Sequence, residues 1–84
     1  MEINHRLEES VLEVVDNQLR SNDPPETRQT FDRLISEGYS EKEAKELIGH
    51  VVASEIFVVL KNQEPFNLVR FVDALNKLPK LPGD

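Results

Sequence analysis

Apolar residues recur at three- and four-residue steps along most of this chain, which is the spacing of one face of a helix. The pattern covers roughly residues 3–19, 24–37, 41–61 and 67–77, and it contains no alternation typical of strands. It predicts an all-α fold, a compact bundle of about four helices of which two are long and two are shorter. In the longest segment the apolar face contains Ala44, Leu47, Ile48, Val51, Val52 and Val59.

Short signals mark where the second predicted helix begins and ends. Asp23 precedes two prolines, so we expect it to accept a hydrogen bond as the N-cap, with the prolines in the first turn where no amide hydrogen is needed. Gly38 stands where a left-handed C-terminal cap is expected, and Tyr39 is placed to fold back on the last turn.

Similar signals bound the next two helices. Ser40 and Glu43 have the spacing of a capping box, and Pro65 interrupts the helical pattern. Asn67 is the predicted cap of the last helix. The final residues, 78–84, are rich in proline, so we expect an irregular strap whose leucines, Leu78 and Leu81, dock on the helices.

Size and composition limit what such a bundle can be. The 84 residues suffice for a single domain, 1–84, with one core. The absence of cysteine fits a cytoplasmic protein, and we expect neither a signal peptide nor a membrane span. A net charge of −6 and few aromatic residues disfavour binding to nucleic acid or to an anionic membrane surface.

Glu55 is the residue that fits this pattern least, because it falls near the centre of the apolar face of the longest helix. A buried carboxylate must be hydrogen-bonded, paired with a cation, bound to a metal or protonated. The apolar stripe of the first helix likewise includes Gln18 and, towards its side, Glu8. Glu8, Gln18 and Glu55 are therefore a candidate buried polar cluster.

Two interpretations of these polar residues stay open. Carboxylates that project inward from facing helices can hold a divalent metal, with Glu8 and Glu55 as ligands. His5 with Glu9 and Glu46 with His50 are i,i+4 pairs that could also chelate a metal. The alternative is a hydrogen-bonded structural network without any cofactor.

The longest helix is apolar almost all the way round in its second half, so it must be covered on several sides. Gly49 inside that helix indicates a close approach of another backbone. We therefore predict a protein-binding surface, for another protein or for a second copy of the chain. Its candidate residues are Gly49, Ala53, Ile56, Phe57 and Leu60.

Three stretches of the chain form a recognisable pattern: the turn from Asn22 to Thr27, then Val51, Val52, Glu55 and Ile56, and then Pro65, Phe66, Leu78 and Pro79. In these residues the chain resembles a family of short uncharacterised bacterial all-helical proteins. Histidines spaced by four on the first and third helices of that family imply a metal-binding ancestry. The matching positions here hold Glu8, Leu12, Lys42 and Glu46.

The resemblance implies a fold and no reaction. No nucleophile lies in a glycine-rich elbow and no zinc-binding HExxH motif occurs, so we expect a protein that is not an enzyme. The first prediction is thus a non-enzymatic helical module that binds another protein or itself. The alternative is a divalent-metal-binding helical bundle that uses buried carboxylates.

Overall fold

The computed structural model describes the backbone of residues 5–83 and the side chains of residues 8–83. Within this part of the chain the fold is all-α, with no strands, as the spacing of apolar residues predicts. None of its helices is long and apolar enough to cross a membrane. The four helices are α1 (His5–Ser21), α2 (Pro25–Ser36), α3 (Glu41–Asn62) and α4 (Leu68–Lys77).

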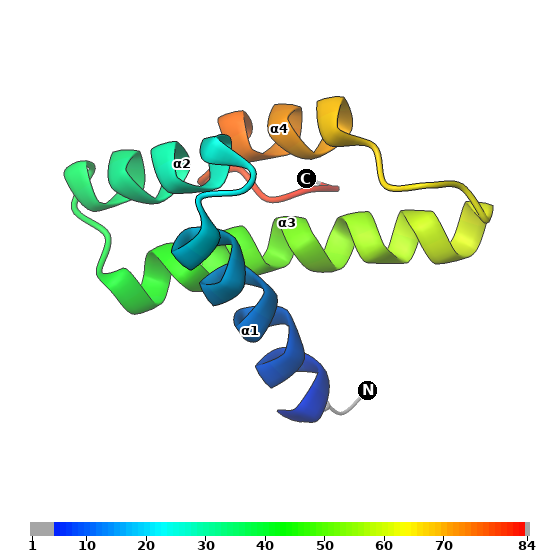
Figure 1. Ribbon diagram of the computed structural model, residues 1–84. Coiled ribbons are helices and arrows are strands. Elements are labelled where there is room, and N and C mark those ends of the chain that lie inside the picture. Colours follow the sequence, from blue (N-terminus) through cyan, green and yellow to red (C-terminus); the bar gives the residue numbers. More distant parts are fainter. Residues whose placement is uncertain (1–4, 84) are drawn as a thin grey trace.

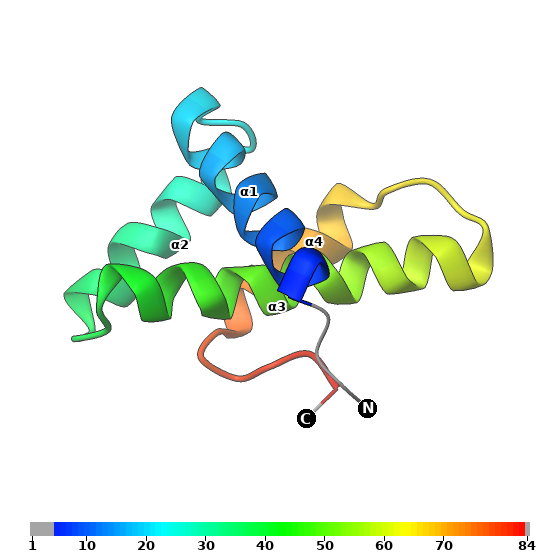
Figure 2. The ribbon, with the colours of Figure 1, turned by 90° about the horizontal axis from the view of Figure 1, so that it is seen from below.

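Helix α3 is the central element, and the other three helices pack against it (Figure 1). Helix α1 crosses α3 near its middle, whereas α2 and α4 follow one another along α3 (Figure 1). The C-terminal half of α3 extends beyond α1 (Figure 2). The core gathers buried side chains from all four helices and from Leu78. Its members are Val11, Val15, Leu19, Phe31, Leu34, Ala44, Ile48, Val51, Val52, Phe71, Leu75 and Leu78.

Most helix ends follow the predicted signals. Gly38 has a φ of 103°, and the amides of Gly38 and Tyr39 donate to the carbonyls of Ile35 and Leu34, which together form a Schellman cap. The capping box of Ser40 and Glu43 is present in both directions. These local predictions are confirmed.

The prediction for Asp23 is wrong. The residue that caps α2 is Pro24, which makes no side-chain hydrogen bond, and Pro25 is the first helical residue. The Thr27 amide donates to the Pro24 carbonyl at 3.1 Å, and the Asp23 amide donates to the Gln18 carbonyl at 3.1 Å. The turn between α1 and α2 is therefore held by backbone hydrogen bonds rather than by a carboxylate cap.

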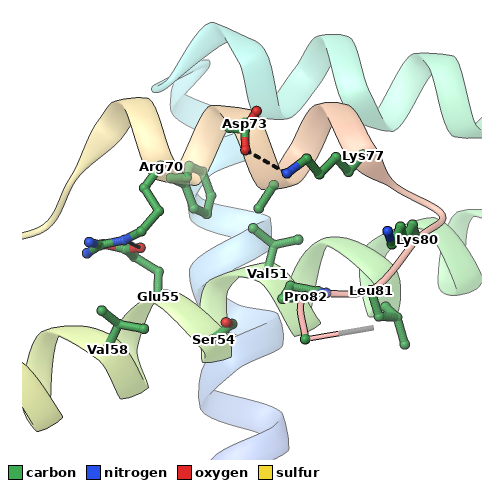
Figure 3. A pocket seen from close by; sticks show the side chains of 13 residues that line it. Val51, Ser54, Glu55, Val58, Arg70, Asp73, Lys77, Lys80, Leu81 and Pro82 are labelled. Atoms are coloured by element: carbon green, nitrogen blue, oxygen red, sulfur yellow. Dashed lines mark hydrogen bonds and ion pairs between the residues drawn. The ribbon is translucent and has the colours of Figure 1, made fainter.

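The segment after α4 folds back as the strap that the sequence predicts. Leu78 is 2% exposed, and Leu81 is partly buried against the core. Leu81 and Pro82 lie beside Val51 in the space between α3 and α4 (Figure 3). This strap thus closes one end of the gap between the two helices.

Candidate functional site

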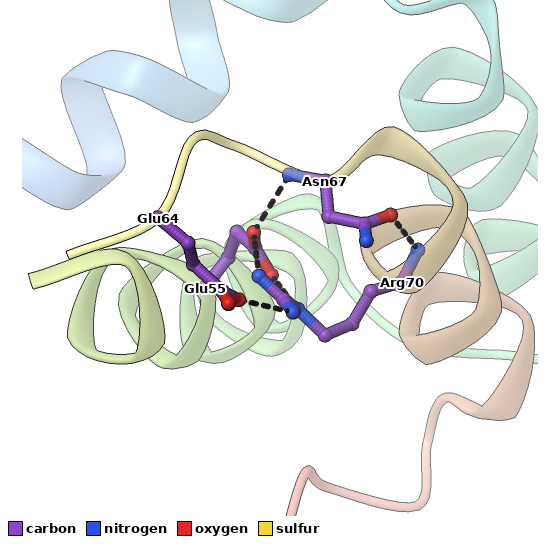
Figure 4. A network of polar contacts seen from close by, with 4 residues as sticks. All are labelled: Glu55, Glu64, Asn67 and Arg70. Atoms are coloured by element: carbon purple, nitrogen blue, oxygen red, sulfur yellow. Dashed lines mark hydrogen bonds and ion pairs between the residues drawn. The ribbon is translucent and has the colours of Figure 1, made fainter. Parts of the chain in front are cut away.

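Glu55 is the centre of a polar network that joins α3 to α4 (Figure 4). Its side chain is 6% exposed. Arg70 Nε donates to Glu55 Oε1 and Arg70 Nη2 donates to Oε2, each at 2.8 Å, so the guanidinium binds the carboxylate in a bidentate manner. The backbone amide of Asn67 donates to Oε2 at 3.0 Å.

A second carboxylate completes the network. Arg70 Nη1 donates to Glu64 Oε1 at 2.7 Å, so one guanidinium bridges two glutamates. The side chain of Asn67 accepts from the Arg70 amide at 3.0 Å and caps α4, as predicted. The loop between α3 and α4 is therefore fixed at both ends by the same four residues.

The network also determines how these groups ionise. The side-chain hydrogen bonds from Arg70 lower the pKa of Glu55, and although burial opposes this, the Asn67 amide adds to the lowering. Hydrogen bonds to Glu55 and Glu64 raise the pKa of Arg70 above its usual value. At neutral pH the pair is thus charged, and the Glu55 carboxylate already accepts three hydrogen bonds. The arrangement is that of a structural ion pair rather than of a proton-transferring base.

The expected cluster of Glu8, Gln18 and Glu55 is not formed. Glu8 is exposed, while Gln18 Oε1 accepts from the buried Thr27 hydroxyl at 2.8 Å and so links α1 to α2. The physical reason is the crossing of α1 over α3, since two crossing helices contact one another only near the crossing point. Residues 8–10 of α1 are therefore exposed.

The candidate metal ligands whose side chains the structure describes form no shared site either. Within the described part of the chain, no group of three or more His, Asp or Glu residues could hold a metal ion. Glu46 is partly buried and His50 is exposed, whereas the side chain of His5 lies outside the described residues. In this structure the partner of the Glu55 carboxylate is the guanidinium of Arg70.

The candidate interface residues fall into two groups. Gly49 is buried under α1: a Cβ atom at this position would lie 3.3 Å from Cγ1 of Val11 and 3.7 Å from Cδ2 of Leu12. The close approach predicted at Gly49 is thus made by side chains of α1, and Gly49 belongs to the core. Ala53 is partly buried and packs against the core.

The remaining three candidates face outward on the C-terminal half of α3. Ile56 is 41% exposed, Phe57 63% and Leu60 72%. We call Ile56, Phe57 and Leu60 the α3 apolar face. These three large hydrophobic side chains are exposed to solvent, as the apolar breadth of this helix predicts.

Sequence reasoning missed two features. Arg70 was not singled out as the partner of Glu55, although its position one turn after the Asn67 cap placed it beside the start of α4. A second exposed apolar group was also missed, on the loop and the first turn of α4. It consists of Phe66, Leu68 and Val69. The ring of Phe66 is tilted by 56° to the buried ring of Phe71, with the two ring centres 5.4 Å apart.

Comparison with known proteins identified no match among family models, curated proteins or solved structures. The resemblance to short bacterial helical proteins stays a prediction.

Proposed function

We propose that this chain is a non-enzymatic helical module that associates with a second copy of itself through the α3 apolar face. The observation that carries the proposal is the exposure of Phe57 and Leu60, which place most of their side-chain surface in water. Contiguous exposed apolar side chains of this size are typical of protein-binding surfaces. The cytoplasm stays the proposed location, because the chain contains no cysteine.

The charge pattern of α3 supports an interface at this place. Charged residues make up 31% of the chain, yet between Ile56 and Gln63 Lys61 is the one ionisable residue. The Lys61 ammonium lies 5.8 Å from the centre of the Phe57 ring, at the border of the α3 apolar face. Interface centres are depleted in charge and enriched in aromatic residues, and this surface has both properties.

The position of the α3 apolar face favours another copy of the chain as its occupant. The C-terminal half of α3 extends beyond α1, so a neighbouring helix could approach it without meeting α1 (Figures 1 and 2). Ala53, Ile56, Phe57 and Leu60 follow the i, i+3, i+4, i+7 spacing of a helix-packing stripe. Such a stripe is complementary to itself across a twofold axis, as isologous dimer interfaces require.

The proposed dimer should be weak. Full burial of a large apolar side chain contributes about 1.5–3 kcal/mol, so the exposed parts of three such residues on each copy contribute roughly 6–10 kcal/mol. Association costs about 4–15 kcal/mol in lost freedom of motion. The most favourable balance, about 6 kcal/mol, corresponds to a dissociation constant of roughly 40 μM, and any higher association cost gives a weaker dimer.

Solution mass as a function of protein concentration tests the proposal. Sedimentation equilibrium of the wild-type chain should show a monomer–dimer equilibrium that Leu60→Glu abolishes. Val69→Asp is the matched control, because Val69 is 80% exposed on α4 and lies outside the α3 apolar face. A wild-type chain that stays monomeric at millimolar concentration would refute the proposal.

A further inference from the structure

A groove between α3 and α4, closed at one end by the strap, is not used by the proposed dimer (Figure 3). We call it the α3–α4 groove. Its volume is about 240 Å³, which is that of roughly eight water molecules in the liquid. Its apolar lining consists of Val51, Val58, Phe71, Ala74, Leu81 and Pro82.

Three basic side chains line the same groove: Arg70, Lys77 and Lys80. The two carboxylates there are each bound to a cation, since Glu55 pairs with Arg70 and Asp73 pairs with Lys77 at 3.0 Å. Lys80 forms no ion pair within the described part of the chain. Arg70 also pairs with Glu64 from outside the lining, so Lys80 is the basic side chain of the groove that no carboxylate of the described residues neutralises.

The two lysines are placed at one end of the groove. Figure 3 shows Lys77 on α4 and Lys80 on the strap at this end, whereas the Arg70–Glu55 pair lies at the other. The Lys77–Asp73 pair is exposed on both sides, with side-chain exposures of 62% and 63%. An exposed pair of this kind can exchange partners at little cost in free energy.

We propose that the α3–α4 groove binds a small aliphatic monocarboxylate of medium chain length. Its carboxylate lies at Lys77 and Lys80, and its hydrocarbon chain lies along the apolar lining towards Val58. The unpaired ammonium of Lys80 selects a monoanion, and the apolar lining requires that the rest of the ligand be hydrocarbon.

This site is independent of the proposed dimer. Glu55 faces the groove, and Ile56 and Leu60 lie about 100° and 140° further round the helix at 100° per residue. A carboxylate in the groove thus leaves the α3 apolar face uncovered. Failure of one proposal does not affect the other.

A titration of the ¹⁵N-labelled chain with sodium octanoate, followed by amide chemical shifts, tests the proposal. The expected result is saturable shifts at Val51, Ala74 and Leu81. Affinity should increase about fourfold for each methylene from butanoate to octanoate, until the groove is full. Octanol and octylamine, matched in length but without the negative charge, should bind more weakly than octanoate.

Variants of Lys80 test the role of the positive charge. Lys80→Gln should weaken octanoate binding by about threefold or more, and Lys80→Arg should restore it. Lys42→Gln is the matched control, because Lys42 is exposed in the first turn of α3 and is absent from the groove lining. The proposal is overturned if octanoate shifts Ile56 and Leu60 instead of the groove, if octanol binds equally well, or if Lys80→Gln binds as the wild type does.

Discussion

Arg70 binds the buried carboxylate of Glu55 with two hydrogen bonds of 2.8 Å, although the two residues lie 15 positions apart in the chain. The contact joins the middle of α3 to the first turn of α4, on either side of a loop. Glu64 in that loop binds the same guanidinium, so a single side chain fixes the loop as well as the helix. The packing of α4 is thus tied to one ion pair.

Removal of Arg70 should destabilise the fold strongly. Arg70→Gln would leave Glu55 buried without its cation, and breaking such a pair costs about 3–5 kcal/mol when both partners are buried. The side chain of Arg70 is 36% exposed, so we expect about 2–3 kcal/mol, measured by urea unfolding at pH 7. Lys77→Gln, which breaks the exposed pair with Asp73, is the control and should cost less than about 1 kcal/mol. Equal decreases in the free energy of unfolding for the two variants would contradict the conclusion that the packing of α4 depends on Arg70.

The Glu55–Arg70 pair should make stability depend on acid pH. Arg70 lowers the pKa of Glu55 in the folded chain below its ordinary value of 4.5, so the unfolded chain takes up this proton first as the pH falls. The pair therefore stabilises the fold fully above about pH 4.5. This stabilisation is lost as the pH falls towards the pKa of Glu55 in the folded chain. Urea unfolding of the wild type between pH 7 and pH 3 should show this decline.

Glu55→Gln tests whether Glu55 causes this pH dependence of stability. It cannot ionise, so its free energy of unfolding should decline less steeply with acid than that of the wild type. Glu43, whose pKa is also lowered by its bonds with the backbone and the side chain of Ser40, should account for part of what remains. Identical slopes for the wild type and Glu55→Gln would contradict the assignment.

Substitutions of Gly49 should report the contact between α1 and α3. Gly49→Leu should destabilise the fold by about 1–3 kcal/mol, because a large side chain would overpack the space against Val11 and Leu12. Gly49→Ala should stay within about 1 kcal/mol of the wild type, since its gain in helix propensity offsets the 3.3 Å approach to Val11. Thermal unfolding would measure both.

A neighbouring position supplies the control for Gly49. His50 is exposed on the same helix, so His50→Leu adds comparable apolar volume without a steric conflict. We expect His50→Leu to change stability by less than about 0.5 kcal/mol. If Gly49→Leu is tolerated equally well, then α1 does not pack closely on α3.

The features that the sequence predicted correctly are those whose causes act over a few residues. The Schellman cap at Gly38 and the capping box of Ser40 and Glu43 depend on backbone groups within one turn, so their spacing in the sequence already specifies them. The helical periodicity of α3 likewise predicted that Glu55 would be buried, and it is 6% exposed.

The features that the sequence did not predict depend on how helices cross. Nothing in the spacing of α1 reveals that it meets α3 at Gly49, which leaves Glu8 in solvent and gives Gln18 a partner on α2 rather than on α3. The partner of Glu55 was missed for a related reason. Arg70 reaches it from the next helix, and such a pairing depends on where the loop directs α4.

The most direct test of self-association through the α3 apolar face is the solution mass of the wild type beside Phe57→Ser. Sedimentation equilibrium should give a reversible dimer for the wild type and a monomer for Phe57→Ser. The helix content of Phe57→Ser by circular dichroism should be unchanged, since Phe57 is 63% exposed. Added salt should strengthen the wild-type dimer, because each copy carries a net charge of −6. A wild-type chain that is monomeric up to millimolar concentration, or a dimer that Phe57→Ser leaves intact, would contradict the account.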